Sequence, residues 1–186
     1  MEHKDKFEQV WEKGDYRRGS TAQRLVPFIL DLIPENKSIN DYGCGTGRAE
    51  LEILKQRPEQ EINMVDIALN ALEFDILEHP NVYFQCSDLS YLGKNFPKAD
   101  WGLCINTLMT VQPDKLDMIL SEVKRTCDNL IFEAYDMDDF RLGKNMTTVK
   151  KNKEEWESKL KEFWKTVLFY PSSESKRRYI FVCKGE

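Results

Sequence analysis

The sequence predicts an α/β protein with a doubly wound, mostly parallel sheet of seven strands, helices on both faces and an antiparallel hairpin at the C-terminal end. Two observations predict this fold class. From residue 38 onward, strand-like and helix-like segments alternate, as they do in a parallel sheet covered by helices. Near the C-terminus, the connection between two strand-like segments is too short to hold a helix, so these two can pair only in the antiparallel sense.

Two helices are expected before the sheet. Phe7 and Trp11 lie at helical spacing in a segment that ends near Gly14. A second helix with an apolar face follows and closes at Pro34. Because Pro27 lies within it, this helix is expected either to kink or to start later.

The alternation then supplies five strands and their connections. The predicted strands are residues 38–42, 62–67, 82–87, 101–106 and 129–135. The predicted helices are residues 48–57, 68–78, 113–126 and 152–164, and the closing hairpin comprises residues 166–170 and 178–183. No repeat or linker interrupts the pattern. We therefore expect a single domain over residues 1–186, with N-terminal helices in 1–35 and the sheet core in 36–186.

Composition narrows the class of protein. The chain has 186 residues, of which 41% are hydrophobic, and a formal net charge of −5. No apolar run reaches the roughly 18 residues of a membrane span, and the N-terminus has no apolar signal segment, so we expect a cytoplasmic protein with no membrane partner. Residues 1–140 carry 15 basic and 26 acidic residues, whereas residues 141–186 carry 12 and 6. The basic end is either a solvated face or a rim that attracts an anionic substrate.

The cysteines and histidines offer little for metal or triad chemistry. The five cysteines form no C-x-x-C pair, which is typical of reduced thiols in a protein core. Only His3 and His79 could assist them as metal ligands or as bases. We therefore expect no metal site.

The most informative segment follows the first predicted strand and reads Asp41-Tyr42-Gly43-Cys44-Gly45-Thr46-Gly47. Glycines at alternate positions remove side chains from the turn, so that a ligand can approach the backbone closely. The helix that follows offers unpaired N–H groups, and this edge of an open parallel sheet is where ligands bind. The segment therefore predicts a binding loop.

Acidic residues end the next two predicted strands. Asp66 is placed to accept hydrogen bonds from two ribose hydroxyls, and Asp88 is placed to accept one from an exocyclic amine. Leu89 lies beside Asp88, where it could pack against a base. The glycine loop and the two acids therefore lie at the ends of three successive predicted strands, and this arrangement favours a nucleoside-containing ligand.

On these residues the chain resembles the class I S-adenosylmethionine-dependent methyltransferases, over about residues 10–184. The resemblance implies that the glycine loop passes under the methionine part of the cofactor, that Asp66 binds the ribose and that Asp88 binds the adenine amine. It also implies that a Tyr or Arg of the leading segment reaches the methionine carboxylate. The cofactor-binding residues expected from it are Tyr16, Arg24, Asp41, Gly43, Cys44, Gly45, Gly47, Asp66, Ile67, Asp88, Leu89 and Asn106.

A dinucleotide-dependent dehydrogenase is the main competing interpretation. Its glycine pattern is G-x-G-x-x-G, and counted from Gly43 the third glycine would fall on Arg48. Asp41, Asp88 and the closing hairpin also fit that class poorly.

The loop after the fourth strand bears on the methyl acceptor. By resemblance, this loop borders both cofactor and substrate. Enzymes that methylate amino groups of nucleic acids carry Asn/Asp-Pro-Pro-aromatic here, whereas this chain has Asn106-Thr107-Leu108-Met109. Many small-molecule relatives place a histidine near Thr110, so a histidine base is not expected. Glu133 or Asp136, at the end of the fifth strand, is the candidate base or the candidate holder of a cationic substrate group, and we select Glu133 as the catalytic candidate.

The resemblance implies methyl transfer from S-adenosylmethionine to an O or N nucleophile. Because the segment over residues 137–153 is too short for a substrate domain, we expect a small-molecule acceptor. The basic C-terminal segment keeps open an acceptor on nucleic acid or another anionic macromolecule. The absence of a recognisable acceptor motif keeps open a module that binds S-adenosylmethionine without catalysis.

Overall fold

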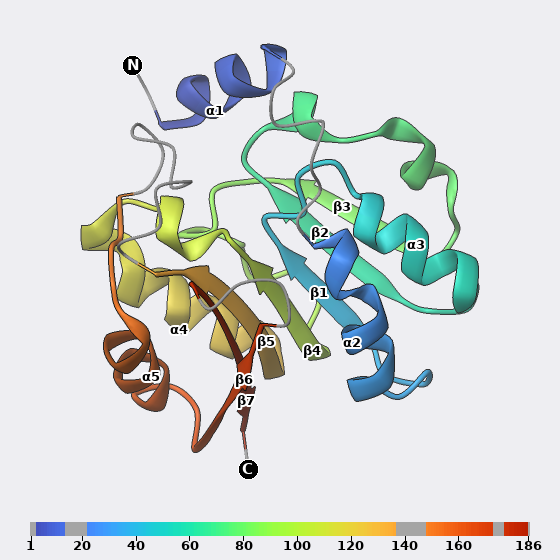
Figure 1. Ribbon diagram of the computed structural model, residues 1–186. Coiled ribbons are helices and arrows are strands. Elements are labelled where there is room, and N and C mark those ends of the chain that lie inside the picture. Colours follow the sequence, from blue (N-terminus) through green and yellow to red (C-terminus); the bar gives the residue numbers. More distant parts are fainter. Residues whose placement is uncertain (1–2, 14–21, 137–147, 173–176, 186) are drawn as a thin grey trace.

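The computed structural model describes residues 3–13, 22–136, 148–172 and 177–185 (Figure 1). Within these residues, seven strands form one sheet in the order β3-β2-β1-β4-β5-β7-β6. The strands are β1 (Ile39–Tyr42), β2 (Ile62–Asp66), β3 (Val82–Cys86), β4 (Ala99–Ile105), β5 (Cys127–Tyr135), β6 (Thr166–Pro171) and β7 (Arg178–Lys184). Strands β1 to β5 run parallel, and β7 is antiparallel to both β5 and β6. The predicted fold class, including the closing hairpin, is confirmed.

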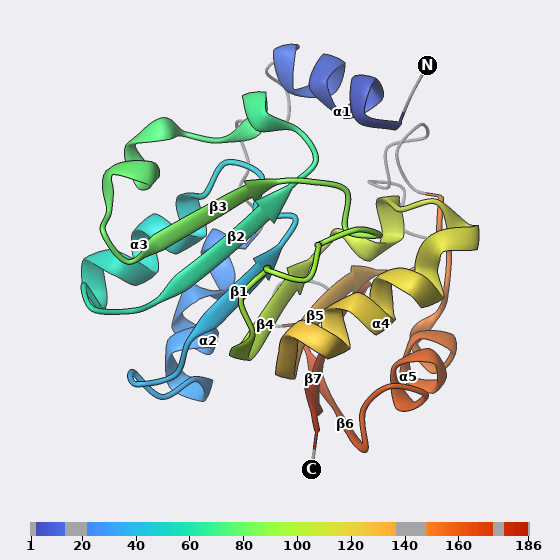
Figure 2. The same cartoon turned by 180° about the vertical axis from the view of Figure 1, so that it is seen from behind.

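The helices divide between the two faces of the sheet, as Figures 1 and 2 show from opposite sides. The helices are α1 (His3–Glu12), α2 (Val26–Leu32), α3 (Arg48–Gln56), α4 (Leu116–Thr126) and α5 (Lys153–Lys161). Apolar residues of α2 and α3 form one buried cluster with one face of the sheet, and those of α4 and α5 form a second cluster with the other face. Among the described helices, none has both the length and the apolar character that a membrane crossing requires.

The strand order places a ligand-binding edge at the centre of the sheet. From β1 the chain passes to β2 and β3 on one side, and then returns to the other side of β1 for β4 and β5. Loops therefore diverge between the carboxyl ends of β1 and β4, which is the switch point where open α/β sheets bind ligands. The glycine loop follows β1 at this point, and α1 lies across the same edge in both views (Figures 1 and 2).

The later start of the second helix is confirmed. An α-helix begins at Val26, after a short 3-10 turn over Gln23–Leu25. Pro27 lies in the first turn of α2, where a missing N–H removes no helical hydrogen bond.

The predicted helix over residues 68–78 is wrong. Two 3-10 helices occupy this stretch, η3 (Leu69–Ala71) and η4 (Phe74–Glu78). Between them Leu72 and Glu73 are extended, and the Glu73 N–H donates to the carbonyl of Thr46 over 3.0 Å. Hydrogen bonding to the glycine loop therefore replaces the helical ladder at this point, and the apolar residues still reach the core.

Candidate functional site

The glycine loop between β1 and α3 is built on left-handed backbone. Gly43, Gly45 and Gly47 have φ values of +88°, +56° and +77°, which side chains with a Cβ rarely adopt. A Cβ placed on Gly43 would lie 2.3 Å from Oγ1 of Thr107, so the loop passes directly against the segment that follows β4. The sequence pattern thus produces the bare backbone surface that was expected, at the switch point of the sheet.

Asp66 ties this loop to the end of β2. Its two carboxylate oxygens accept the N–H groups of Gly45 and Ala68, each over 2.9 Å. Burial raises the pKa of Asp66, and the backbone hydrogen bonds oppose that shift. Each carboxylate oxygen can accept a second hydrogen bond, so the side chain can hold the loop and receive a ligand hydroxyl together. The next residue, Ile67, is half-buried beside it.

Asp41 and Glu50 form a buried acidic pair beneath the loop. The Asp41 side chain is 3% exposed and lies next to that of Glu50. Glu50 belongs to the first turn of α3 and is fully buried. Burial first, and then the nearby Glu50, raises the pKa of Asp41 well above its usual range, and burial raises that of Glu50. Asp41 therefore supports the loop from below. Sequence reasoning missed Glu50 because the spacing of an amphipathic helix does not reveal a charged residue turned inward.

The loop after β3 carries Asp88 and Leu89. One Asp88 oxygen accepts both the N–H and the hydroxyl of Ser90 at 2.8 Å, and the other lies 3.4 Å from Nζ of Lys115. Partial burial raises the pKa of Asp88, but these hydrogen bonds and the lysine charge outweigh it, so the pKa lies below its usual value. Leu89 is buried. Asp88 is thus held ionised and in place beside the same edge.

Trp11 of α1 lies over the glycine loop. A Cβ placed on Gly45 would meet the Trp11 ring at 3.3 Å, and the Asn70 side-chain amide donates to the Glu8 carbonyl over 2.9 Å, which fixes α1 against η3. The sequence predicts a helix containing Trp11 but gives no sign of where that helix docks. The one sequence feature that could have indicated this position is that α1 has few apolar residues, which is unusual for a helix packed in the core.

At the end of β5, Glu133 is enclosed by partners. It is fully buried, and both of its carboxylate oxygens accept hydrogen bonds from Arg24. Asn106 donates its side-chain amide to Glu133 over 3.0 Å and its backbone N–H to the Glu133 carbonyl over 2.9 Å. Asn106 has φ +58°, the one described non-glycine residue with positive φ, and such backbone strain is typical of functional sites. Burial raises the pKa of Glu133, and Arg24 opposes the shift.

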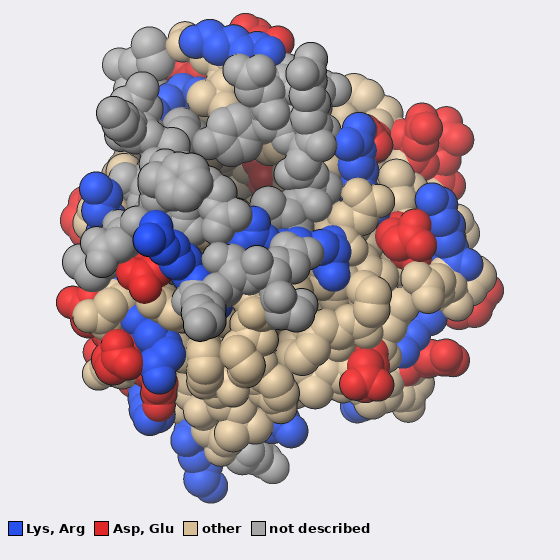
Figure 3. All heavy atoms as spheres, in the orientation of Figure 1, with Lys and Arg blue, Asp and Glu red and all other residues tan. Residues whose placement is uncertain are grey.

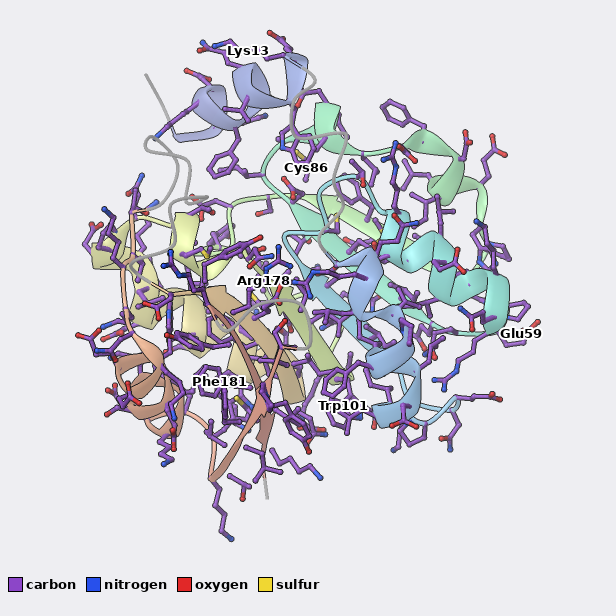
Figure 4. The ribbon with its side chains drawn as sticks, in the orientation of Figure 1. Lys13, Glu59, Cys86, Trp101, Arg178 and Phe181 are labelled. Atoms are coloured by element: carbon purple, nitrogen blue, oxygen red, sulfur yellow. The ribbon has the colours of Figure 1, made fainter. Side chains whose placement is uncertain are left out.

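The start of β7 adds a cation to this edge. Arg178 is paired in register with Tyr135 and holds its guanidinium carbon 4.7 Å from the centre of the Tyr135 ring. Figure 4 shows Arg178 near the middle of the molecule, whereas Trp101 and Phe181 lie toward the far end of the sheet. Lys and Arg side chains gather across the centre of the same view in Figure 3. Asp136 accepts a hydrogen bond from the Tyr179 hydroxyl. Sequence reasoning missed Arg178 because it lies 45 positions beyond Glu133 along the chain.

The structure thus brings most of the predicted site residues to one edge. Asp41, Gly43, Gly45, Gly47 and Asp66 belong to a single hydrogen-bonded or packed unit, and Arg24, Asn106 and Glu133 form a second unit next to it. The half-buried thiol of Cys44 belongs to the loop, and burial raises its pKa. Tyr16 and Arg17 lie outside the described residues.

Comparison with known proteins identifies this architecture. Residues 39–129 match the family described as "Methyltransferase domain". Over 104 residues, the chain is 31% identical to malonyl-[acyl-carrier protein] O-methyltransferase of Halalkalibacterium halodurans, a match that covers 52% of this chain and 38% of that protein. The chain therefore spans less than two fifths of this curated relative.

Solved structures show the same fold. The 1,6-didemethyltoxoflavin-N1-methyltransferase of Burkholderia thailandensis, with bound S-adenosylhomocysteine, aligns with a TM-score of 0.74 at 17% identity, covering 98% of this chain and 87% of that one. The small RNA methyltransferase HEN1 aligns with a TM-score of 0.73 at 15% identity, covering 90% of this chain and 26% of that one. The chain therefore has the class I, Rossmann-like fold of these methyltransferases, and residues 39–129 within it match the methyltransferase domain family.

Proposed function

We propose that this chain transfers a methyl group from S-adenosylmethionine to an O or N nucleophile on a small molecule. One observation carries the proposal, namely the glycine loop held by Asp66 at the switch point of the sheet, where a Cβ on Gly43 or Gly45 would collide with or crowd a neighbour. The matching family and the neighbour with bound S-adenosylhomocysteine support this choice of cofactor.

The residues present fit this cofactor. Asp66 keeps acceptor capacity for ribose hydroxyls after binding two amides, and Asp88 is held ionised for the adenine amine. Leu89 would pack against the base, and the glycine loop would lie along the methionine part. Tyr16 and Arg24 remain the candidates for the methionine carboxylate. When bound, the cofactor supplies an activated methyl group on a sulfonium.

The chain's own contribution is alignment and electrostatics. Fixing two reactants in line can lower a barrier by roughly 7–11 kcal/mol. Asp88, whose pKa is lowered, carries a negative charge at this edge of the sheet and so favours a cationic ligand over a neutral one. The proposed nucleophile is O or N because the curated relative is named an O-methyltransferase and the toxoflavin enzyme an N1-methyltransferase.

Calorimetry tests the cofactor. We expect S-adenosylmethionine and S-adenosylhomocysteine to bind the wild-type protein, and Asp66→Ala to weaken binding by roughly ten- to a hundredfold, because charged hydrogen bonds are worth about 1.5–3 kcal/mol. The exposed Asp75 is the matched control, since Asp75→Ala leaves the site intact. Binding of NAD in place of S-adenosylmethionine would assign the chain to the dehydrogenases instead.

A coupled assay for S-adenosylhomocysteine release tests the acceptor class, using a panel of metabolites and oligonucleotides. Turnover with small molecules supports the proposal. Turnover with oligonucleotides alone, lost steeply as salt rises, would favour a nucleic-acid acceptor. Binding of the cofactor without turnover of any acceptor would favour a non-catalytic module.

A further inference from the structure

The fully buried carboxylate of Glu133 joins segments that lie far apart along the chain. Arg24, from the 3-10 turn before α2, donates to both of its oxygens. Asn106, in the loop after β4, donates its side-chain amide to one of these oxygens over 3.0 Å. Burial raises the pKa of Glu133, and the charges of Arg24 and Arg178 oppose that shift. Glu133 thus connects residues 109 and 27 positions away from it.

These contacts suit Glu133 poorly to the role of a general base. The two oxygens of a carboxylate offer about four acceptor positions, and described side chains already use three of them. A base must also reach the proton that it removes, whereas this side chain is fully enclosed. Proton uptake would weaken both hydrogen bonds from Arg24, because a neutral carboxyl accepts less strongly than a carboxylate. The arrangement therefore favours holding its partners over proton transfer.

The network continues from Glu133 to the glycine loop. The N–H of Asn106 donates to the Glu133 carbonyl over 2.9 Å, so Glu133 holds both the backbone and the side chain of Asn106. These bonds support the strained φ of +58° at Asn106. Thr107 follows, and its Oγ1 lies 2.3 Å from the place of a Cβ on Gly43. The backbone that Glu133 holds therefore sets where the loop after β4 meets the glycine loop.

We propose that Glu133 is a positioning residue, which holds Arg24 and Asn106 at the methionine end of the cofactor site, and this inference rests on the proposed methyltransferase function. Arg24 is the candidate partner of the methionine carboxylate. A guanidinium carries five donors in a rigid fork, so it can bind Glu133 and a ligand carboxylate together. Glu133 fixes the direction of that fork before the cofactor arrives, and less conformational freedom is then lost on binding.

Calorimetry with two ligands tests this role. The ligands are S-adenosylhomocysteine and 5′-methylthioadenosine, which has the same nucleoside and thioether but lacks the amino-acid part. We expect Glu133→Gln and Arg24→Gln each to weaken S-adenosylhomocysteine binding by roughly ten- to a hundredfold and to leave methylthioadenosine binding near that of the wild type. Asp128 is exposed near the other end of β5, so Asp128→Asn is the matched control and should bind both ligands as the wild type does.

A double variant guards against a loss of folding. Combining Glu133→Gln with Arg24→Gln replaces the ion pair by two amides, which avoids leaving the charge of either residue without the other. Its affinity for S-adenosylhomocysteine should match that of either single variant, because the two residues act as one unit.

Three results overturn the inference. Unchanged S-adenosylhomocysteine affinity in Glu133→Gln would leave Glu133 as a candidate base. Equal weakening of both ligands would indicate a general structural effect, and additive losses in the double variant would show that Glu133 acts independently of Arg24. If the wild-type protein binds no S-adenosylhomocysteine, the proposed function itself fails, which separates the two failures.

Discussion

At the scale of single residues, Gly43 fixes the distance between the carboxyl ends of β1 and β4. Its φ is +88°, and an added Cβ would lie 2.3 Å from Thr107 Oγ1 and 2.4 Å from Thr107 Cγ2. We expect Gly43→Ala to lower the free energy of unfolding by about 1–3 kcal/mol, the usual cost of overpacking, and to weaken cofactor binding. Chemical denaturation and calorimetry measure these two effects.

Gly93 offers a control for the backbone part of that effect. It has φ +76°, but an added Cβ meets nothing within 4 Å. Gly93→Ala therefore carries the cost of a left-handed alanine without the collision. Equal losses of stability in the two variants would show that Thr107 yields freely and that Gly43 is needed only for its backbone conformation.

The buried pair Asp41 and Glu50 makes stability depend on pH. Both pKa values are raised by burial, so the folded protein favours the protonated forms. The stability linked to these protons is complete below the ordinary carboxyl pKa of about 4 and is lost as pH rises through the raised values. We expect Glu50→Gln to gain stability relative to wild type as pH rises from about 4 toward neutrality.

Denaturation at several pH values measures that gain. Glu59 is exposed on the loop after α3, so the free energy of unfolding of Glu59→Gln should change with pH as that of the wild type does. A difference between Glu50→Gln and wild type that is constant with pH, or that shrinks as pH rises, would contradict the shared burial of the two carboxyls.

Residue patterns predicted the backbone of the site better than its side-chain partners. Gly43, Asp66 and Asp88 were found because their residue types are required at strand ends, where a ligand approaches the main chain. The pairing of Arg24 with Glu133 spans 109 positions in the sequence, and such a contact leaves no local pattern. The predicted catalytic role of Glu133 stays a prediction. Its pairing with Arg24 favours a role in holding that arginine in place.

At the scale of elements, α1 lies over the glycine loop, and none of its described residues belongs to the two buried clusters. We expect Trp11→Ala to weaken S-adenosylhomocysteine binding by roughly three- to tenfold, because an aromatic contact is worth about 0.5–1.5 kcal/mol. The thermal midpoint without ligand should stay within a few degrees of wild type, since the core is untouched. Calorimetry and circular dichroism measure the two quantities.

Fluorescence gives an independent check on α1. Trp101, Trp156 and Trp164 are at most 7% exposed, so Trp11 is the tryptophan whose surroundings a ligand at the loop can change. A ligand-induced change in emission should disappear in Trp11→Phe and persist in Phe169→Ala, which removes an exposed aromatic ring on β6, away from the loop. A change that persists in Trp11→Phe would mean that α1 does not cover the bound cofactor.

Elements differ in how far sequence predicts them. Every strand was predicted to within two residues at each end, because buried strands combine apolar runs with clear turn residues. Residues 68–78 were predicted as one helix because their apolar spacing fits one. The hydrogen bond from Glu73 to Thr46 and the ion pair between Arg48 and Glu73 instead break the segment into two short turns. Such tertiary contacts override local spacing.

At the scale of the whole molecule, we expect the cofactor and the methyl acceptor to bind at the same edge of the sheet. We expect the carboxyl ends of β1, β2 and β3 to hold the cofactor and those of β4 and β5 to face the acceptor. Part of the excess acidity of residues 1–140 lies at the end of the sheet where we expect the cofactor, in Asp41, Asp66 and Asp88. The sequence could predict this part of the site, because the glycine loop and its acids are local features. The contact between Arg24 and Glu133 at the end of β5 is not local, so the sequence does not predict it.

Because the cofactor would join elements from both ends of the core, its binding should stabilise the molecule as a unit. A ligand at a hundred times its dissociation constant adds about 2.7 kcal/mol to the free energy of unfolding. For a domain of 150–250 residues, each kcal/mol raises the thermal midpoint by about 2–4 °C. We therefore expect S-adenosylhomocysteine at that concentration to raise the midpoint by roughly 5–10 °C, measured by differential scanning fluorimetry, and Asp66→Ala to reduce the rise sharply at the same concentration. A rise of equal size in Asp66→Ala would place the cofactor away from the end of β2 and remove the basis of the site.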